Sequence, residues 1–325
     1  MNATVKPLQI GSVRLSSPVI LAPMAGVCDL PYRVIARRYG AALVCTEMVS
    51  DKGLLYNNVH TREMLRIDER EHPVSMQIFG ADPDTMAKAA CAVEKAGADI
   101  VDINMGCPAP KIVKNHEGSA LLDDPDLIFR IVKAVSQAVT VPVTVKIRKG
   151  RRKGDDQAVE AALAAQEGGA KAVTVHGRTA QQMYSGQADW EVIRRVKEAL
   201  SIPVIGNGDV TDGPSALDML NQTGCDAVMV GRAMMGDPWV FDNISACFNG
   251  EPVPEKPEPG DVFKQALEQA RMMVEDKGEY AGIRQMRAQL VWYMKGLPGA
   301  AHKKQKLTAV TSLAELEEIL SDPDF

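Results

Sequence analysis

The chain has 325 residues, of which 46% are hydrophobic and 24% charged, and its formal net charge is −5. These values are typical of a soluble globular protein with room for one large domain and a smaller one. No apolar segment reaches the length of a membrane span, which excludes a membrane-spanning protein. The negative charge also disfavours nucleic acid as a ligand, unless basic residues gather locally.

Six cysteines are spread along the chain, at positions 28, 45, 91, 107, 225 and 247. They form no CxxC pair and no Cys/His pattern typical of a metal site, which predicts a reducing compartment and no bound metal. The first 17 residues lack the pattern of a signal peptide, because Pro18 and Pro23 interrupt the first apolar stretch. We therefore expect a cytoplasmic, monomeric protein without a membrane partner.

From residue 18 to residue 232, short branched apolar segments alternate with longer amphipathic segments. The apolar segments predict eight strands, at residues 19–22, 43–48, 74–79, 100–104, 143–147, 172–176, 204–206 and 227–230. The clearest predicted helices lie between them, at 84–96, 125–138, 156–167 and 189–200. Eight alternating strand and helix units predict a (β/α)8 TIM barrel. A doubly wound open sheet is the alternative, but it needs a glycine-rich turn where the chain has only Gly26.

A linker composition follows the barrel segment. Residues 249–261 contain four prolines and two glycines. Helical apolar spacing then returns at 262–279, 280–295 and 312–320, with no segment that resembles a strand. The sequence therefore predicts an α/β barrel domain over residues 1–250 and a C-terminal all-helical domain over residues 251–325.

Polar residues or glycine-rich turns follow nearly every predicted strand, at the end where TIM barrels bind their ligands. The turns at 207–209 and 231–232 follow the seventh and eighth strands, which is the usual phosphate-binding position of this fold. Ordinary turn glycines are the alternative interpretation of these two segments. In chain order, the candidate residues are Pro23, Met24, Ala25, Gln77, Asn104, Cys107, Lys146, Arg148, His176, Arg178, Asn207, Gly208, Asp209, Gly231 and Arg232.

Lys146 is an unusual residue for the interior of a barrel. An ammonium group there is costly unless it is paired or faces a polar ligand. A flavin ring would be such a ligand, because positive charge near its N1 atom stabilises the reduced, anionic form. The alternative is a salt bridge from Lys146 to Glu47 or Asp102. His176 also has two interpretations, a ligand-facing side chain or a core histidine with its hydrogen bonds satisfied.

Cys107 comes directly after the fourth predicted strand. Pro108 cannot donate a hydrogen bond to a strand ladder, and Gly106 frees the backbone before it, so the strand must stop there. Cys107 is therefore predicted to lie on a loop at the carboxyl end of the barrel, where a substrate can reach its thiol. The alternative is a cysteine that only packs.

Five motifs, taken together and in order, resemble those of the tRNA-dihydrouridine synthases, especially the bacterial B-type members. The resemblance covers nearly the whole chain. The motifs are Pro23-Met24-Ala25-Gly26, Asp102-Ile103-Asn104-Met105-Gly106-Cys107-Pro108, His176-Gly177-Arg178-Thr179, Asn207-Gly208-Asp209 and Gly231-Arg232-Ala233.

The resemblance implies a flavoenzyme that reduces a uridine in the D-loop of tRNA to 5,6-dihydrouridine. FMN would transfer a hydride to C6, Cys107 would protonate C5, and Asn104 would hold the uracil edge. NADPH or NADH would reduce the flavin. The residues implied to hold FMN are Pro23, Met24, Ala25, Gln77, Lys146, His176, Asn207, Gly208, Asp209, Gly231 and Arg232.

An RNA substrate requires positive charge near the site, because a uridine in folded RNA must be flipped out and its phosphates held. Two segments are basic: residues 146–153, and residues 280–314, which contain no acid and include Lys295. The family usually has a lysine and a histidine after Arg287, whereas this chain has Ala288 and Gln289. The residues expected to contact tRNA are Arg148, Arg178, Lys111, Arg284 and Arg287.

Three other functions fit part of the pattern. An FMN barrel that reduces a free pyrimidine or another small molecule would share the strand ends but would not need the basic helical tail. An RNA-binding protein that has lost its chemistry would not need Cys107 and Lys146. A phosphate-binding barrel without flavin would explain the last two turns, but not Gln77, Lys146 and Cys107 together.

Overall fold

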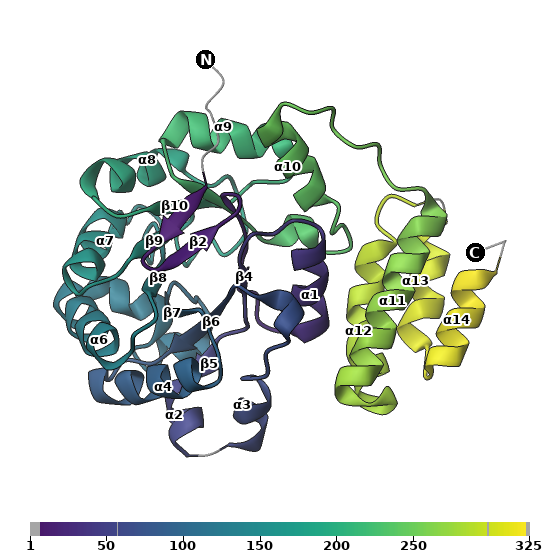
Figure 1. Ribbon diagram of the computed structural model, residues 1–325, viewed down its shortest axis with the longest axis horizontal. Coiled ribbons are helices and arrows are strands. Elements are labelled where there is room, and N and C mark those ends of the chain that lie inside the picture. Colours follow the sequence, from purple (N-terminus) through teal and green to yellow (C-terminus); the bar gives the residue numbers. More distant parts are fainter. Residues whose placement is uncertain (1–6, 57, 298, 323–325) are drawn as a thin grey trace.

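The computed structural model describes residues 7–56, 58–297 and 299–322, and its centre is a barrel of parallel strands (Figure 1). In chain order the barrel strands are β3 (Val19–Leu21), β4 (Val44–Cys45), β6 (Val74–Phe79), β7 (Ile100–Met105), β8 (Val143–Arg148), β9 (Ala172–His176), β10 (Val204–Asn207) and β11 (Ala227–Val230). Because β3 pairs with β11, and Ile20 of β3 bridges to Leu43 just before β4, the sheet closes on itself. The predicted (β/α)8 TIM barrel is confirmed.

Helices that follow the strands cover the outside of the barrel (Figure 1). Four of them begin at an aspartate whose carboxylate accepts a hydrogen bond from the first turn, at Asp29, Asp82, Asp124 and Asp212, with a proline in that turn. The four predicted helices are confirmed to within two residues. The helices are α1 (Leu30–Arg38), α4 (Pro83–Lys95), α6 (Pro125–Ala138), α7 (Ala158–Glu167), α8 (Trp190–Ala199), α9 (Gly213–Thr223) and α10 (Val240–Asn249).

A short hairpin packs on the amino-terminal end of the barrel, where the sequence pattern predicts no strand. It consists of β1 (Leu8–Ile10) and β2 (Val13–Leu15), which pair antiparallel. Leu8, Ile10 and Leu15 are buried in one apolar cluster with the first residues of β7, β9 and β11. Strands of three residues are too short for an alternating pattern to stand out, which is why the sequence does not predict them.

The second predicted strand, 43–48, is wrong in its second half. The strand ends with β4 at Cys45. At the next position the backbone amide of Gln77 donates to the side-chain hydroxyl of Thr46 (3.2 Å) and not to a backbone carbonyl of the ladder. The short strand β5 (Val49–Ser50) then pairs with β6. The short elements in the loops are α2 (Asp51–Leu55), α3 (Val59–Glu63), η1 (Glu69–Glu71), α5 (Pro110–Val113), η2 (Gly118–Asp123) and η3 (Arg232–Met234).

Four helices at the carboxyl end of the chain pack together beside the barrel (Figure 1): α11 (Pro259–Lys277), α12 (Glu279–Tyr293), α13 (Ala300–Ala309) and α14 (Leu313–Ser321). The sequence predicts three of them and misses α13, because only Leu307 of that helix is buried and no apolar period results. The predicted division of the chain into a domain over residues 1–250 and a domain over residues 251–325 stays a prediction. Residues 1–6 of the first domain and 323–325 of the second lie outside the described residues.

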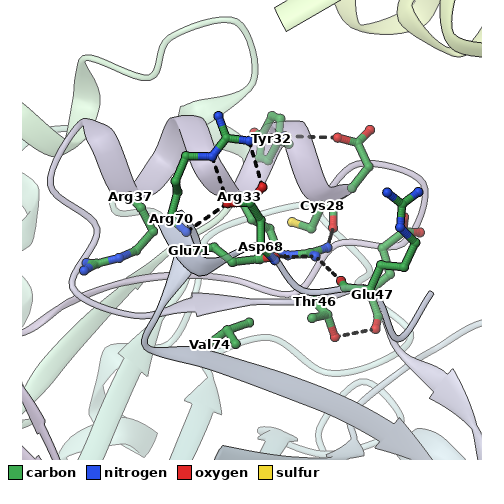
Figure 2. Close-up of polar contacts among 12 residues, drawn as sticks. Cys28, Tyr32, Arg33, Arg37, Thr46, Glu47, Asp68, Arg70, Glu71 and Val74 are labelled. Carbon is green, nitrogen blue, oxygen red and sulfur yellow. Dashed lines mark hydrogen bonds and ion pairs between the residues drawn. The ribbon is translucent and has the colours of Figure 1, made fainter. Parts of the chain in front are cut away.

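A buried ion pair ties α1 to the segment before β6 (Figure 2). Arg33 on α1 and Glu71 on η1 are 4% and 0% exposed, and two guanidinium nitrogens of Arg33 donate to the two carboxylate oxygens of Glu71. Arg33 also donates to the carbonyls of Cys28 (2.8 Å) and Arg66 (3.1 Å), and Glu71 accepts the amide of Asp68 (2.7 Å). The pair therefore fixes the loop that connects β3 to α1.

We expect Glu71→Gln to destabilise the protein, because the Arg33 guanidinium then stays buried without an anionic partner. Breaking a buried pair from one side costs about 3–5 kcal/mol in free energy of unfolding. Urea unfolding followed by circular dichroism should show a clearly lower midpoint. Glu69→Gln, at an exposed position of the same short helix, is the matched control. Equal midpoints for the two variants would show that the pair adds nothing to stability.

Candidate active site

A cavity of about 650 Å³ opens at the carboxyl end of the barrel strands. Its volume lies within the range typical of cofactor and small-molecule sites. The cavity is lined by every residue predicted to hold the flavin, and also by Asn104, Cys107, Arg148 and Arg178. The other residues predicted to contact tRNA are not part of its lining: Lys111, Arg284 and Arg287.

A chain of hydrogen bonds between buried side chains forms the floor of the cavity. Asp102 accepts one hydrogen bond from Gln77 Nε2 and one from the Thr144 hydroxyl, both at 2.6 Å. Gln77 Oε1 in turn accepts a hydrogen bond from Asn104 Nδ2 (2.8 Å). Burial raises the pKa of the Asp102 carboxyl, and its two hydrogen bonds oppose that shift. The chain fixes which way the amides of Gln77 and Asn104 point.

Cys107 lies in the loop between β7 and α5, and three groups hold this loop. Asn104 Oδ1 accepts the backbone N–H groups of Gly106 (3.1 Å) and Cys107 (2.9 Å). Arg148 Nε donates to the carbonyl of Gly106 (3.0 Å). A Cβ atom at Gly118 would lie 2.8 Å from the Cys107 carbonyl oxygen, so only glycine fits there. Burial raises the pKa of the half-buried Cys107 thiol, which is therefore protonated at neutral pH.

Lys146 lies on β8 and lines the cavity. Its Nζ atom donates to Asn207 Oδ1 (3.0 Å), and Asn207 Nδ2 donates to the carbonyl of Met229 (2.8 Å). Within the described residues, neither Glu47 nor Asp102 forms an ion pair with Lys146, so the alternative of a salt bridge is not found. Burial lowers the pKa of Lys146 to about 8, which leaves the amine mostly charged at neutral pH.

Arg148 holds a second loop besides the one that carries Cys107. Its Nη1 atom donates to the carbonyls of Thr179 (3.1 Å) and Met183 (3.0 Å), in the loop between β9 and α8. The guanidinium is buried, and its hydrogen bonds go to backbone carbonyls of two different loops. Arg148 therefore joins the wall that carries the thiol to the neighbouring wall of the cavity.

Arg178 is fully enclosed at the end of β9 and holds the same β9–α8 loop. It donates to the carbonyls of Ser185 (3.2 Å) and Gly186 (2.6 Å), and to both carboxylate oxygens of Asp209 (2.7 and 2.9 Å). Its Nη1 atom is buried without a hydrogen-bond partner among the described residues. An unpaired buried donor beside a cavity is a position where a ligand oxygen would complete the hydrogen bonding.

His176 and Arg232 lie close to these groups. The Arg232 guanidinium lies over the Tyr184 ring, 4.7 Å from its centre, and 4.0 Å from the Asp209 carboxylate. Burial, together with the positive charges of the neighbouring lysine and arginines, holds the pKa of His176 far below its usual value, so the imidazole is neutral. No side-chain hydrogen bond joins His176 to another described residue, so the interpretation as a satisfied core histidine is not supported.

Two glycines line the cavity for different reasons. Gly208 has a φ of +114°, and a Cβ atom there would lie 2.7 Å from the Cβ atom of Ala188, so the fold itself requires glycine. A Cβ atom at Gly231 would contact only Ala22 and Met24, both at the ordinary distance of 3.7 Å. Gly231, Ala22 and Met24 all line the cavity, so the absence of a side chain at Gly231 leaves space there for a ligand.

The three predicted tRNA contacts outside the cavity lie on exposed or partly exposed surface. Lys111 is exposed on α5, Arg284 is exposed on α12, and Arg287 donates to the carbonyl of Val310 (2.7 Å). Their roles stay predictions. Sequence reasoning missed Lys295, which follows α12 and lines the cavity. The sequence includes it in a basic segment, but no local pattern connects a tail residue with the ends of barrel strands.

Within residues 7–56, 58–297 and 299–322, no helix is long and apolar enough to cross a membrane. Nor do they contain a group of three or more His, Cys, Asp or Glu side chains arranged to hold a metal ion. The six cysteines, all described, are free thiols.

Two solved structures share the barrel at low sequence identity. One is the 6-hydroxypseudooxynicotine amine oxidase of Pseudomonas geniculata N1, with a TM-score of 0.60, 15% identity and 76% of this chain covered. The other is the histamine dehydrogenase of Rhizobium sp. 4-9, with a TM-score of 0.59, 13% identity and 83% of this chain covered. The chain spans about half the length of each, and the likeness shows the fold alone.

Curated relatives are similar over nearly the whole chain. The probable tRNA-dihydrouridine synthase 1 of Synechocystis sp. is 43% identical, covering 97% of this chain and 88% of its own. The tRNA-dihydrouridine synthase B of Pseudomonas aeruginosa is also 43% identical, with 90% and 88% covered. A probable tRNA-dihydrouridine synthase of Mycobacterium tuberculosis is 39% identical, with 98% and 85% covered.

A family model agrees with these relatives. The model described as dihydrouridine synthase matches residues 20–324, which run from the second residue of β3 through the C-terminal helices. The match confirms the resemblance that the five sequence motifs indicate. The chain therefore belongs to the dihydrouridine synthase family.

Proposed function

We propose that this chain reduces a uridine of tRNA to 5,6-dihydrouridine, with FMN as its cofactor and NADPH or NADH as the reductant. The observation that carries the proposal is that the Cys107 thiol and the partly buried Lys146 ammonium group line the same cavity. The names of the curated relatives support the tRNA substrate. The polar floor and the two turns after β10 and β11 support a cofactor with a ring and a phosphate.

The residues of the cavity fit FMN in two independent respects. The Nη1 atom of Arg178 is a buried donor without a partner, and a phosphate or ring oxygen would supply one. The space beside Gly231 admits a ligand close to the backbone. The residues that would hold FMN are Pro23, Met24, Ala25, Gln77, Lys146, His176, Asn207, Gly208, Asp209, Gly231 and Arg232.

When bound, FMN would supply the hydride that adds to C6 of the uracil ring, and NADPH or NADH would return the FMN to its reduced form. The proton that adds to C5 comes from the Cys107 thiol, which burial keeps protonated at neutral pH. Asn104 keeps the thiol in place through its Oδ1 atom, and its Nδ2 atom donates to Gln77. One N–H group of Asn104 then remains for the uracil edge.

Reoxidation of reduced flavin tests the proposal directly. The purified protein would be reduced with NADPH without oxygen, then mixed with unmodified tRNA or with free uridine or orotate. We expect only tRNA to reoxidise the flavin and to acquire dihydrouridine. Reoxidation by a free pyrimidine and not by tRNA would assign the same site to the reduction of a small molecule.

Replacement of the thiol should separate cofactor binding from turnover. We expect Cys107→Ala to retain its flavin and the reduction of that flavin by NADPH, while dihydrouridine formation in tRNA falls by about 10²–10⁴-fold, the usual contribution of a general acid. Cys91→Ala, at an exposed position of α4, is the control and should remain fully active. Loss of flavin in Cys107→Ala would contradict the role as proton donor.

A side chain at position 231 should weaken cofactor binding without unfolding the protein. Gly231→Ala places a methyl group in the cavity, and overpacking of this kind costs about 1–3 kcal/mol. We expect the flavin-free variant to bind FMN about 10-fold more weakly in a fluorescence titration. Gly260→Ala, where a Cβ atom meets nothing within 4 Å, should bind FMN like the wild type. Unchanged affinity in Gly231→Ala would place the cofactor elsewhere.

A further inference from the structure

The cavity carries a strong excess of positive charge. Among the described residues, five cationic side chains and one carboxylate line it: Lys146, Arg148, Arg178, Arg232 and Lys295, with Asp209. Such an excess attracts more than one anionic group, because a single phosphate would neutralise only part of it.

Four of the five cations are already engaged with the barrel. Lys146 donates to Asn207, and Arg148 donates only to backbone carbonyls. Arg178 pairs with the single carboxylate of the cavity, and Arg232 lies over an aromatic ring beside that same carboxylate. Each of these groups is placed by the barrel and its loops.

Lys295 differs from the other four in its origin and in its surroundings. It comes from the helical part of the chain, two residues after the end of α12, and its side chain is exposed. Its side chain forms no hydrogen bond or ion pair with any residue in the described ranges, and its backbone N–H donates to the carbonyl of Trp292 (3.1 Å). Burial raises the pKa of the Asp237 carboxyl and the positive charge of Lys295 opposes that shift, but the two side chains form no ion pair within 4 Å.

The end of α12 is held firmly at the mouth of the barrel, so the position of Lys295 is not incidental. Gly236, in the loop after η3, has a φ of +77°, and a Cβ atom there would clash with the backbone of Trp292. One turn earlier in α12, Gln289 Nε2 donates to the buried carboxylate of Asp29 (2.8 Å), the N-cap of α1. These contacts join α12 to two loops of the barrel.

We propose that Lys295 binds a backbone phosphate of the RNA strand whose uridine enters the cavity. The inference rests on the proposed function, and it names a residue that makes RNA a better substrate than a free base. A nucleotide within RNA is flanked by phosphates, whereas a free pyrimidine base carries none. A lysine ammonium is a point charge on a flexible side chain and suits a phosphate. When a base is flipped into the cavity, the RNA backbone stays outside at the rim, where the exposed Lys295 can reach it.

The test compares Lys295→Ala with Lys88→Ala, which removes the same charge from an exposed position on α4. For each flavin-loaded variant, the rate of flavin reoxidation by tRNA and the equilibrium binding of tRNA would be measured at several salt concentrations. We expect Lys295→Ala to need about 5- to 10-fold more tRNA for the half-maximal rate, with the same maximal rate and the same reduction by NADPH. Its slope of log affinity against log salt should be smaller by about 1.

Lys295→Arg, which keeps the charge, should restore most of the affinity, and Lys88→Ala should match the wild type. The proposal is overturned if Lys295→Ala and Lys88→Ala have the same affinity and salt slope. It is also overturned if Lys295→Ala loses flavin, because the side chain would then belong to the cofactor site. If tRNA does not reoxidise wild-type flavin, the proposed function fails, and the binding measurement still decides whether Lys295 contacts RNA.

Discussion

The side-chain amide of Asn104 joins the polar floor of the barrel to the loop that carries Cys107. Its nitrogen donates to Gln77, which in turn donates to the buried carboxylate of Asp102, and its oxygen accepts two backbone N–H groups of the loop. In a buried site each of these groups must keep its partner, because an unpaired one costs more than the bond itself contributes. The position of the thiol therefore depends on a carboxylate that never touches it.

Two residues that the sequence predicts to contact RNA, Arg148 and Arg178, also hold loops at the mouth of the barrel. A buried arginine has five donors to satisfy, and the nearest acceptors at a barrel mouth are loop carbonyls. Arg148 and Arg178 donate to four carbonyls of the β9–α8 loop, and Arg148 also to the loop of Cys107. These loops have little regular structure of their own, so the two arginines supply the rigidity that a binding site needs.

The sequence predicts the barrel and the lining of the cavity well, because strand ends carry local signals. Proline and glycine stop a strand within a few residues, and the barrel then brings all such ends together. Partners in space carry no such signal. The hydrogen bond between Arg148 and Gly106 spans 42 positions, and Lys295 reaches the cavity only through the packing of α12. The β1–β2 hairpin and α13 give no period in the sequence, because the strands have three residues each and only Leu307 of α13 is buried.

The hairpin at the amino-terminal end has a kinetic consequence. Within the described residues it fills that end of the barrel with apolar side chains, and the cavity opens at the opposite, carboxyl end of the strands. If a nicotinamide and an RNA strand both act through this cavity, they occupy the same approach and exclude one another. The two substrates would then react in alternation, and each would inhibit the other when in excess. Plots of reciprocal rate against reciprocal concentration of one substrate, at several fixed concentrations of the other, would be parallel lines.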